Sequence, residues 1–240
     1  MSAPMILHKL IAHHAKRGYD HEFSRMQVED AIRWLKAHGV SMAQGTKALD
    51  LGCGAGTFGQ HLFGMGCEVT FADSADWLLP EIPRTCFRRV DLDTASIESL
   101  GCYDLVVCSN VLEHLRDAER LIRSFPALLL PGGHLYLSWT NWLSPWGGHD
   151  FSPWHYLGPR LGPRLFDRLV GRPRMLKPFE NLFVTHIGRT LRSLRAQPAI
   201  KIVAAAPRYY TELWPLMKVP LLREVAAWNC AVLIARVSPP

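Results

Sequence analysis

The stretch ALDLGCGAGTFG, residues 48–59, decides the fold class of this chain of 240 residues. A short apolar run passes there directly into four glycines: Gly52, Gly54, Gly56 and Gly59. The last three follow the pattern G-x-G-x-x-G, which alone is a weak signal. A glycine-rich turn between a strand and a helix lets the backbone approach a ligand closely, and the start of the helix favours anionic groups. The stretch therefore predicts a nucleotide-binding turn after a first strand.

The acid in this stretch separates two classes of nucleotide. Asp50 ends the apolar run, and we expect its carboxylate to point into the glycine turn. A pyrophosphate would meet like-charge repulsion there. A ligand with a cationic amine and no phosphate suits the turn better, and S-adenosylmethionine is such a ligand. The pyrophosphate alternative, a nicotinamide-dependent oxidoreductase, stays open at this point.

Short β-like runs alternate with segments of helix length. The runs are KALDL, CEVTFAD, CFRRVD, YDLVVCS and HLYLSW, followed near the end by AIKIVAAAP and NCAVLIARV. Before the glycines, residues 24–38 have apolar side chains near helical spacing, with Ser24 as the expected N-cap and Gly39 as the stop. Alternation of strand and helix predicts a parallel α/β sheet, which the last two runs close as a pair.

The pattern D-x-G-x-G-x-G from Asp50 to Gly56 resembles the first motif of class I S-adenosylmethionine-dependent methyltransferases. The resemblance covers residues 46–140 and implies S-adenosylmethionine as the cofactor. It implies an α/β fold with a Rossmann-like seven-stranded sheet of order 3-2-1-4-5-7-6, the last strand antiparallel and helices on both faces. We expect one methyltransferase domain over residues 1–240, with N-terminal helices in 1–45, a cofactor-binding core in 46–140, a substrate-side insertion with helices in 141–198 and closing strands in 199–240.

The resemblance also implies roles for single residues. Asp73 would accept hydrogen bonds from both ribose hydroxyls with its two oxygens, and an ordinary helix N-cap is the alternative. Asp91 would lie beside the adenine amino group, with Leu92 as a backbone contact, and Asp93 is the alternative acid. The expected cofactor-binding set is Asp50, Gly52, Cys53, Gly54, Gly56, Asp73, Ser74, Asp91, Leu92 and Asn110.

A Glu-His pair, Glu113 and His114, follows the fourth run. Glu113 either begins a helix, whose dipole its charge complements, or belongs with His114 to a metal site of the kind some relatives have. Two ligands without a third do not define a metal site. The sequence therefore predicts no metal.

Residues 139–158, WTNWLSPWGGHDFSPWHYLG, are unusually rich in large aromatic side chains for a loop. Such a loop needs a surface to cover, so we expect either a lid with a Gly147-Gly148 hinge or the lining of an acceptor pocket. The expected substrate-binding residues are Trp142, Trp146, Trp154 and Tyr156.

Methyl transfer needs the acceptor and the methyl group in line, and a hydroxyl acceptor must also lose its proton. Histidine has the side-chain pKa nearest neutrality. His149 is the first candidate for a catalytic base, and His155 and His114 are the next. The sequence predicts O-methylation of a small-molecule, natural-product or lipid-like acceptor, with a catalytically silent S-adenosylmethionine-binding subunit as an alternative.

The basic residues are concentrated in the C-terminal part of the chain. Residues 1–140 hold 13 Lys and Arg against 16 Asp and Glu, whereas residues 141–240 hold 14 against 5. Arginines and leucines recur there at steps of four: Arg160, Arg164, Arg168, Leu161, Leu165 and Leu169, with Arg172, Arg174 and Lys177 beyond. This pattern indicates either a solvated arginine face over buried leucines or contact with an anionic acceptor or lipid headgroup.

Composition bounds the remaining function classes. No apolar run reaches the roughly 18 residues of a membrane span, and the first 16 residues do not form a secretory signal. We therefore expect a cytoplasmic protein for which peripheral membrane contact is compatible with the basic segment. Nucleic acid is a disfavoured partner, because no recognised RNA-binding module accompanies the charge. The six cysteines contain no C-x-x-C pair that would indicate a zinc ribbon.

Overall fold

The computed structural model of the protein describes residues 6–171 and 176–237. One sheet of order β3-β2-β1-β4-β5-β7-β6 runs through it, as the resemblance to class I methyltransferases implies. Its strands are β1 (Lys47–Leu51), β2 (Glu68–Asp73), β3 (Phe87–Arg89), β4 (Tyr103–Ser109), β5 (Leu129–Thr140), β6 (Ile200–Pro207) and β7 (Asn229–Arg236). Strands β1 to β5 pair in parallel, and β7 is antiparallel to both β5 and β6.

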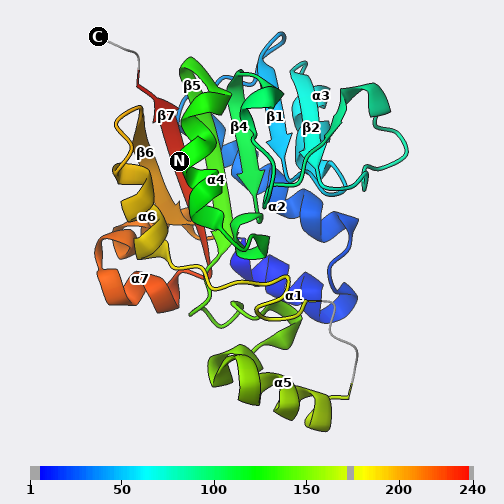
Figure 1. Ribbon diagram of the computed structural model, residues 1–240, viewed down its shortest axis with the longest axis vertical. Helices are drawn as coiled ribbons and strands as arrows, with labels where there is room; N and C mark the ends of the chain where they lie inside the picture. Colours follow the sequence, from blue (N-terminus) through cyan, green and yellow to red (C-terminus); the bar gives the residue numbers. More distant parts are fainter. Residues whose placement is uncertain (1–5, 172–175, 238–240) are drawn as a thin grey trace.

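Helices cover both faces of the sheet, as a buried parallel sheet requires. Within the described residues the α-helices are α1 (Leu7–Arg17), α2 (His21–Ala37), α3 (Thr57–Gly64), α4 (Ala118–Ser124), α5 (Gly158–Leu169), α6 (Ile187–Arg195) and α7 (Pro220–Ala226). One apolar cluster packs α4 and α6 onto one face, and a second packs α2 and α3 onto the other. Figure 1 shows α1 and α5 beyond the end of the sheet toward which the parallel strands point. None of the described helices is long and apolar enough to cross a membrane.

Helix α2 begins three residues before the predicted start. Asp20 has extended backbone angles, and its Oδ1 accepts a hydrogen bond of 2.8 Å from the N–H of Phe23. Ser24 lies in the first turn, where its hydroxyl donates to the carbonyl of Asp20. The expected N-cap at Ser24 is therefore wrong, because the helix begins at His21 and the side chain of Asp20 caps it through the N–H of Phe23.

Strand β5 also begins earlier than the run HLYLSW indicates. It includes the sequence PGG at residues 131–133, where the register against β4 shifts between Tyr103 and Leu105. A Cβ at Gly133 would lie 2.8 Å from the carbonyl oxygen of Tyr103. Glycine thus allows the two strands to approach closely at this irregularity.

Candidate functional site

The glycine turn lies between β1 and α3. Gly52, Gly54 and Gly56 have φ values of 73°, 51° and 80°, a backbone region that glycine adopts at little cost. A Cβ at Gly54 would meet nothing within 4 Å, whereas a Cβ at Gly52 would lie 2.4 Å from Val111. The backbone around Gly54 is therefore open to a ligand, and Gly52 makes the close contact with the segment after β4.

Asp73, the last residue of β2, holds this turn. Its Oδ2 accepts a hydrogen bond of 2.9 Å from the N–H of Gly54, and its Oδ1 accepts one of 2.7 Å from the N–H of Ser74. The hydroxyl of Ser74 also donates to Oδ1, at 3.2 Å. Asp73 can therefore accept a ligand hydroxyl at Oδ2, and a second one at Oδ1 where it replaces the hydroxyl of Ser74. The next element after β2 is the 3₁₀ helix Arg84–Cys86. The alternative role of Asp73 as a helix N-cap is therefore wrong.

Asp50 lies beneath the turn. It is 3% exposed, and its Oδ2 accepts a hydrogen bond of 2.8 Å from the N–H of Gly59 in α3. Burial raises the pKa of Asp50 to about 7, against the opposing effect of that hydrogen bond. The expectation that its carboxylate points into the turn is corrected, because its bond to Gly59 fixes the start of α3. Cys53 is buried as well, and its N–H donates to the carbonyl of Ala72.

The predicted adenine contacts follow β3, beside Asp73. Asp91 is exposed, and the N–H of Asp93 donates to its Oδ1 at 2.9 Å, an effect that lowers the pKa of Asp91. Asp93 accepts a hydrogen bond of 2.8 Å from the N–H of Arg116. Leu92 is buried between them. Asp91 thus holds its own loop and Asp93 binds the segment after β4, and the choice between them as the adenine contact stays a prediction.

Asn110 follows β4 with a left-handed backbone, at φ 57°. Its Oδ1 accepts a hydrogen bond of 2.9 Å from Nη1 of Arg208, whose guanidinium lies 5.3 Å from the centre of the Tyr209 ring. Arg208 is 2% exposed. This buried cation fixes the side chain of Asn110, and the sequence did not indicate it, because no motif distinguishes a single arginine that follows β6.

Glu113 joins the ends of β4 and β5. It lies in the short 3₁₀ helix η3 (Leu112–His114) and is 1% exposed. Its Oε1 accepts a hydrogen bond of 2.9 Å from the N–H of Thr140, the last residue of β5. Its Oε2 has no hydrogen-bond partner among the described residues. A 3₁₀ helix of three residues has no dipole comparable to that of an α-helix, so the expected helix-start role of Glu113 is wrong.

The fold brings two predicted catalytic histidines together with Glu113. His114 and His149 have ring centres 5.9 Å apart, and one ligand atom from each of the three residues lies within 4.8 Å of the other two. Nε2 of His149 is buried, with no hydrogen-bond partner in the described part of the chain. Burial lowers the pKa of His149. The aromatic loop thus adds His149 to the Glu-His pair as a third side chain that could bind a metal ion.

A cavity of about 810 Å³ opens beside these side chains. Its polar residues include Asn110, His114, Thr140 and His149, at the ends of β4 and β5. Its apolar wall comes from α1, α2, the aromatic loop and the segments before and after α7, and includes Leu7, Leu10, Ile11, Phe23, Trp146, Tyr209 and Trp228. No sequence motif indicates that the N-terminal helices line this cavity, because only the tertiary fold places them opposite the loop.

The aromatic loop places Trp146 on the cavity. Its Nε1 donates a hydrogen bond of 2.5 Å to the hydroxyl of Tyr19, and its ring stacks on Trp228 at 5.9 Å. Trp142 is instead buried against Phe179 and His155, with ring centres 5.6 Å and 5.3 Å away. The structure therefore brings one of the four predicted aromatic residues to the cavity wall.

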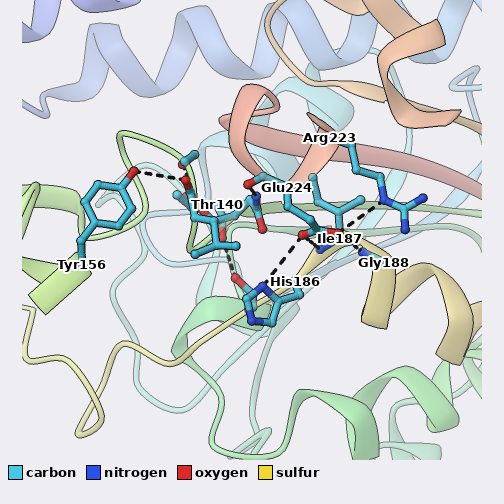
Figure 2. Close-up of polar contacts among 11 residues, drawn as sticks. Thr140, Tyr156, His186, Ile187, Gly188, Arg223 and Glu224 are labelled. Atoms are coloured by element: carbon cyan, nitrogen blue, oxygen red, sulfur yellow. Dashed lines mark hydrogen bonds and ion pairs between the residues drawn. The ribbon is translucent and has the colours of Figure 1, made fainter. Parts of the chain in front are cut away.

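The remaining predicted residues of the loop pack away from the cavity. His155 is 1% exposed and lies 4.0 Å, ring centre to ring centre, from Tyr156. The hydroxyl of Tyr156 donates to the carbonyl of Leu143 at 3.1 Å (Figure 2). The backbone of Trp154 packs against α5: a Cβ at Gly162 would lie 2.4 Å from the carbonyl oxygen of Trp154. The structure assigns none of the three to the cavity lining.

The two glycines of the loop are close-packed. A Cβ at Gly147 would lie 1.9 Å from the carbonyl oxygen of Trp142, and one at Gly148 would lie 2.6 Å from Nδ1 of His155. The N–H of Gly148 also donates to the hydroxyl of Ser152 at 3.0 Å. These contacts indicate a tight turn that needs glycine at both positions, and the hinge stays a prediction.

Hydrogen bonds to Glu224 hold the end of β5, where the aromatic loop begins. Glu224 caps the start of α6, accepting hydrogen bonds of 2.9 Å and 2.7 Å from the N–H groups of Ile187 and Gly188 (Figure 2). The side-chain amide of Asn141 donates to the backbone carbonyl of the same Glu224. The end of β5, and with it the cavity edge at Thr140, is thereby tied to α6 and α7.

Helix α5 carries the predicted basic stripe at its surface. Arg160, Arg164 and Arg168 are exposed, as the stripe predicts. Its buried residues, however, are Gly162 and Phe166, and Leu161 and Leu169 are 51% and 65% exposed. The expected burial of the leucine face is wrong, because Phe166 packs on Phe151 and turns the leucines outward. Arg172 and Arg174 lie outside the described residues.

Comparisons with known proteins identify the family. A family model described as a methyltransferase domain matches residues 11–169. An uncharacterized methyltransferase from Mycolicibacterium vanbaalenii is 33% identical over 209 residues, covering 84% of this chain and 80% of its own. A ubiquinone biosynthesis O-methyltransferase from Acinetobacter baylyi is 28% identical over 119 residues, 46% of this chain and 50% of its own.

A solved structure shares the fold. The S-adenosylmethionine-dependent methyltransferase from Mesorhizobium loti superposes with a TM-score of 0.57 at 22% identity, over 86% of this chain and 98% of that one. The family match decides against the nicotinamide-dependent oxidoreductase. The chain belongs to the methyltransferase domain family, with the class I fold and S-adenosylmethionine as its cofactor.

Proposed function

We propose that the protein transfers a methyl group from S-adenosylmethionine to a hydroxyl of a small, largely apolar acceptor, such as a natural product or a lipid-like molecule. The cavity of about 810 Å³ carries this proposal. Its walls are mostly aliphatic and aromatic, and His114, His149 and Asn110 gather at the ends of β4 and β5. Such a cavity buries an apolar molecule against its aromatic and aliphatic side, while its polar side chains, which also include Gln27, Asp150 and Asn229, orient a functional group.

The residues around the glycine turn fit the cofactor. The open backbone at Gly54 and the two oxygens of Asp73 suit the close approach of a ribose with two hydroxyls. Asp91 or Asp93 would hold the adenine. When bound, S-adenosylmethionine supplies a methyl group on a sulfonium, which is transferred in line. We propose Asn110 as the residue shared by the two sites, because it follows β4 and also lines the cavity.

The chain's contribution to the reaction is to position the acceptor and take its proton. The aromatic and aliphatic wall would hold the acceptor with its hydroxyl at the histidine side, which removes most of the entropic barrier to an in-line transfer. His149 is the first candidate to take the proton, because its Nε2 has no hydrogen-bond partner in the described structure. His114 is the next candidate, since it lines the same cavity.

The lipid-like character of the acceptor rests on two further observations. Helix α5 exposes Leu161 and Leu169 together with three arginines, a combination that suits the surface of an anionic membrane. The relative from Acinetobacter baylyi is named an O-methyltransferase of ubiquinone biosynthesis, although it matches only half of either chain. We propose a cytoplasmic protein that meets its acceptor at the membrane surface.

The test compares acceptors that differ in one atom. Radiolabelled S-adenosylmethionine is incubated with the protein and with pairs of long-chain phenols and anilines that share one scaffold, together with short-chain analogues. We expect the phenol to form a methyl ether at least about ten times faster than the aniline forms a methylamine, and the long chain to lower KM. Preferred N-methylation, or no methyl ether from any phenol while the cofactor binds, would contradict the proposal.

A further inference from the structure

We infer that Glu113, His114 and His149 form a binding site for a divalent transition-metal ion of the zinc type at the acceptor end of the cavity. The inference rests on the proposed function and deepens it, because the ion would hold the hydroxyl oxygen of the acceptor. The sequence predicts no metal, since the Glu-His pair lacks a third ligand. The fold supplies that ligand from the aromatic loop, 35 positions after His114.

Two buried atoms that could bind a metal ion have no hydrogen-bond partner within the described residues, and they indicate a cation between these side chains. Oε2 of Glu113 belongs to a side chain that is 1% exposed, and it has no hydrogen-bond partner among the described residues. Nε2 of His149 is also buried and unpartnered within that part of the chain. Leaving such atoms unsatisfied is costly. A bound cation would satisfy both atoms at once.

The second polar atom of His114 and of Glu113 is hydrogen-bonded to the backbone, as is usual for side chains that bind a metal ion. Nδ1 of His114 lies 2.9 Å from the carbonyl oxygen of Asn181, to which it can donate, so that Nε2 is left for an ion. Oε1 of Glu113 accepts from the N–H of Thr140, which leaves Oε2 directed elsewhere. Backbone partners of this kind orient a ligand and fix the tautomer of a histidine.

The third ligand is positioned by its backbone. His149 has φ 49°, a left-handed conformation that residues other than glycine seldom adopt. It follows the close-packed glycines of the loop, and its ring lies beside that of His114, with centres 5.9 Å apart. The conformation therefore brings a side chain from a distant segment to the Glu-His pair.

The donor set selects the kind of ion. Two imidazoles and one carboxylate with an open position are an arrangement of catalytic zinc sites. Imidazole suits zinc and neighbouring transition metals, whereas magnesium prefers oxygen ligands. The site should therefore bind Zn²⁺ much more tightly than Mg²⁺.

Such an ion would take over the activation of the acceptor. A metal lowers the pKa of a bound water from 15.7 to about 7, and the same effect acts on a bound hydroxyl. The hydroxyl proton leaves to water, the oxygen forms a bond to the methyl carbon, and the C–S bond breaks with its electron pair on sulfur. The products are the methyl ether, S-adenosylhomocysteine and one proton, and the transfer needs no oxidant or reductant.

The experiment measures metal binding apart from activity. Untagged protein is freed of metal by dialysis against a chelator, and Zn²⁺ is titrated by calorimetry, with Co²⁺ absorption as a report of coordination. We expect one ion per chain, and binding at least about a hundredfold weaker in His114→Gln and in His149→Gln. The control is His134→Gln, at a partly buried histidine of β5 that pairs with Leu105 and lies six residues before Thr140. It should bind Zn²⁺ within about twofold of wild type.

Two results would overturn the inference: no stoichiometric Zn²⁺ binding by the wild type, or unchanged binding by the folded His114→Gln protein. His114 has a regular position in η3 without the left-handed backbone of His149, so this variant stays informative if His149→Gln does not fold. Metal-free protein that forms the methyl ether at the wild-type rate would also overturn the inference, and the proposed function would stand. Zn²⁺ binding at these residues without O-methylation of any hydroxyl would support the site and contradict the proposed function.

Discussion

The two sides of the site are built in different ways. On the cofactor side, Asp73 and the turn around Gly54 meet because β1 and β2 are adjacent parallel strands. On the acceptor side, the cavity joins α1 and α2 to Trp146, Tyr209 and Trp228, which are distant in the sequence. A local motif therefore describes the first side, whereas only tertiary packing defines the second.

On the acceptor side, replacement of His149 distinguishes a catalytic histidine from one that only packs. His149→Gln should lower kcat at least about a hundredfold, since loss of a proton acceptor costs about 10²- to 10⁴-fold in rate, and loss of an activating ligand should cost no less. The affinity for S-adenosylmethionine should stay within about twofold, because His149 is outside the glycine turn. Steady-state kinetics and calorimetry measure the two quantities.

The matched variant at this site is His155→Gln. His155 is buried but does not line the cavity, so its replacement should mainly lower the thermal stability. A kcat of His149→Gln within a few fold of wild type, together with a large loss in His155→Gln, would reverse the assignment of the catalytic histidine.

The sequence predicts the cofactor side of the molecule better than the acceptor side. The alternation of runs such as KALDL and CEVTFAD with helical segments predicts the parallel sheet, and the resemblance of the glycine motif to class I methyltransferases implies the strand order that the structure has. The leucine stripe of α5 misleads, since Phe166 decides which face is buried. The role of Glu113 could not be predicted, because its partner Thr140 comes from another strand.

Two glycines of one helix test how tightly the cofactor side is packed. A Cβ at Gly59 would lie 2.3 Å from the buried ring of Phe71, whereas one at Gly64 would meet nothing within 4 Å. Gly59→Ala should lower the free energy of unfolding by about 1 to 3 kcal/mol. Gly64→Ala should leave it unchanged or raise it by up to about 1 kcal/mol. Urea denaturation distinguishes the two, and equal effects would mean that Phe71 yields to the added methyl group.

The exposed arginines of α5 should affect only the binding of the acceptor, and only weakly. Replacing Arg160, Arg164 and Arg168 together by Gln should raise the KM of an anionic lipid-like acceptor about threefold to tenfold and flatten its dependence on salt. Cofactor affinity should not change, because these side chains are exposed on α5. A KM that is unchanged at low salt would make the arginines an ordinary solvated face.

Calorimetric titration with S-adenosylmethionine tests whether Asp73 and the glycine turn form the cofactor site. The wild type should bind with micromolar Kd, about −8 kcal/mol. Asp73→Ala should weaken binding at least about tenfold, because buried hydroxyls would lose their acceptor. Asp104→Ala, an exposed acid at the opposite end of the strands, should leave the affinity unchanged. No binding by the wild type, or equal binding by a folded Asp73→Ala protein, would mean that Asp73 and the glycine turn do not hold the cofactor.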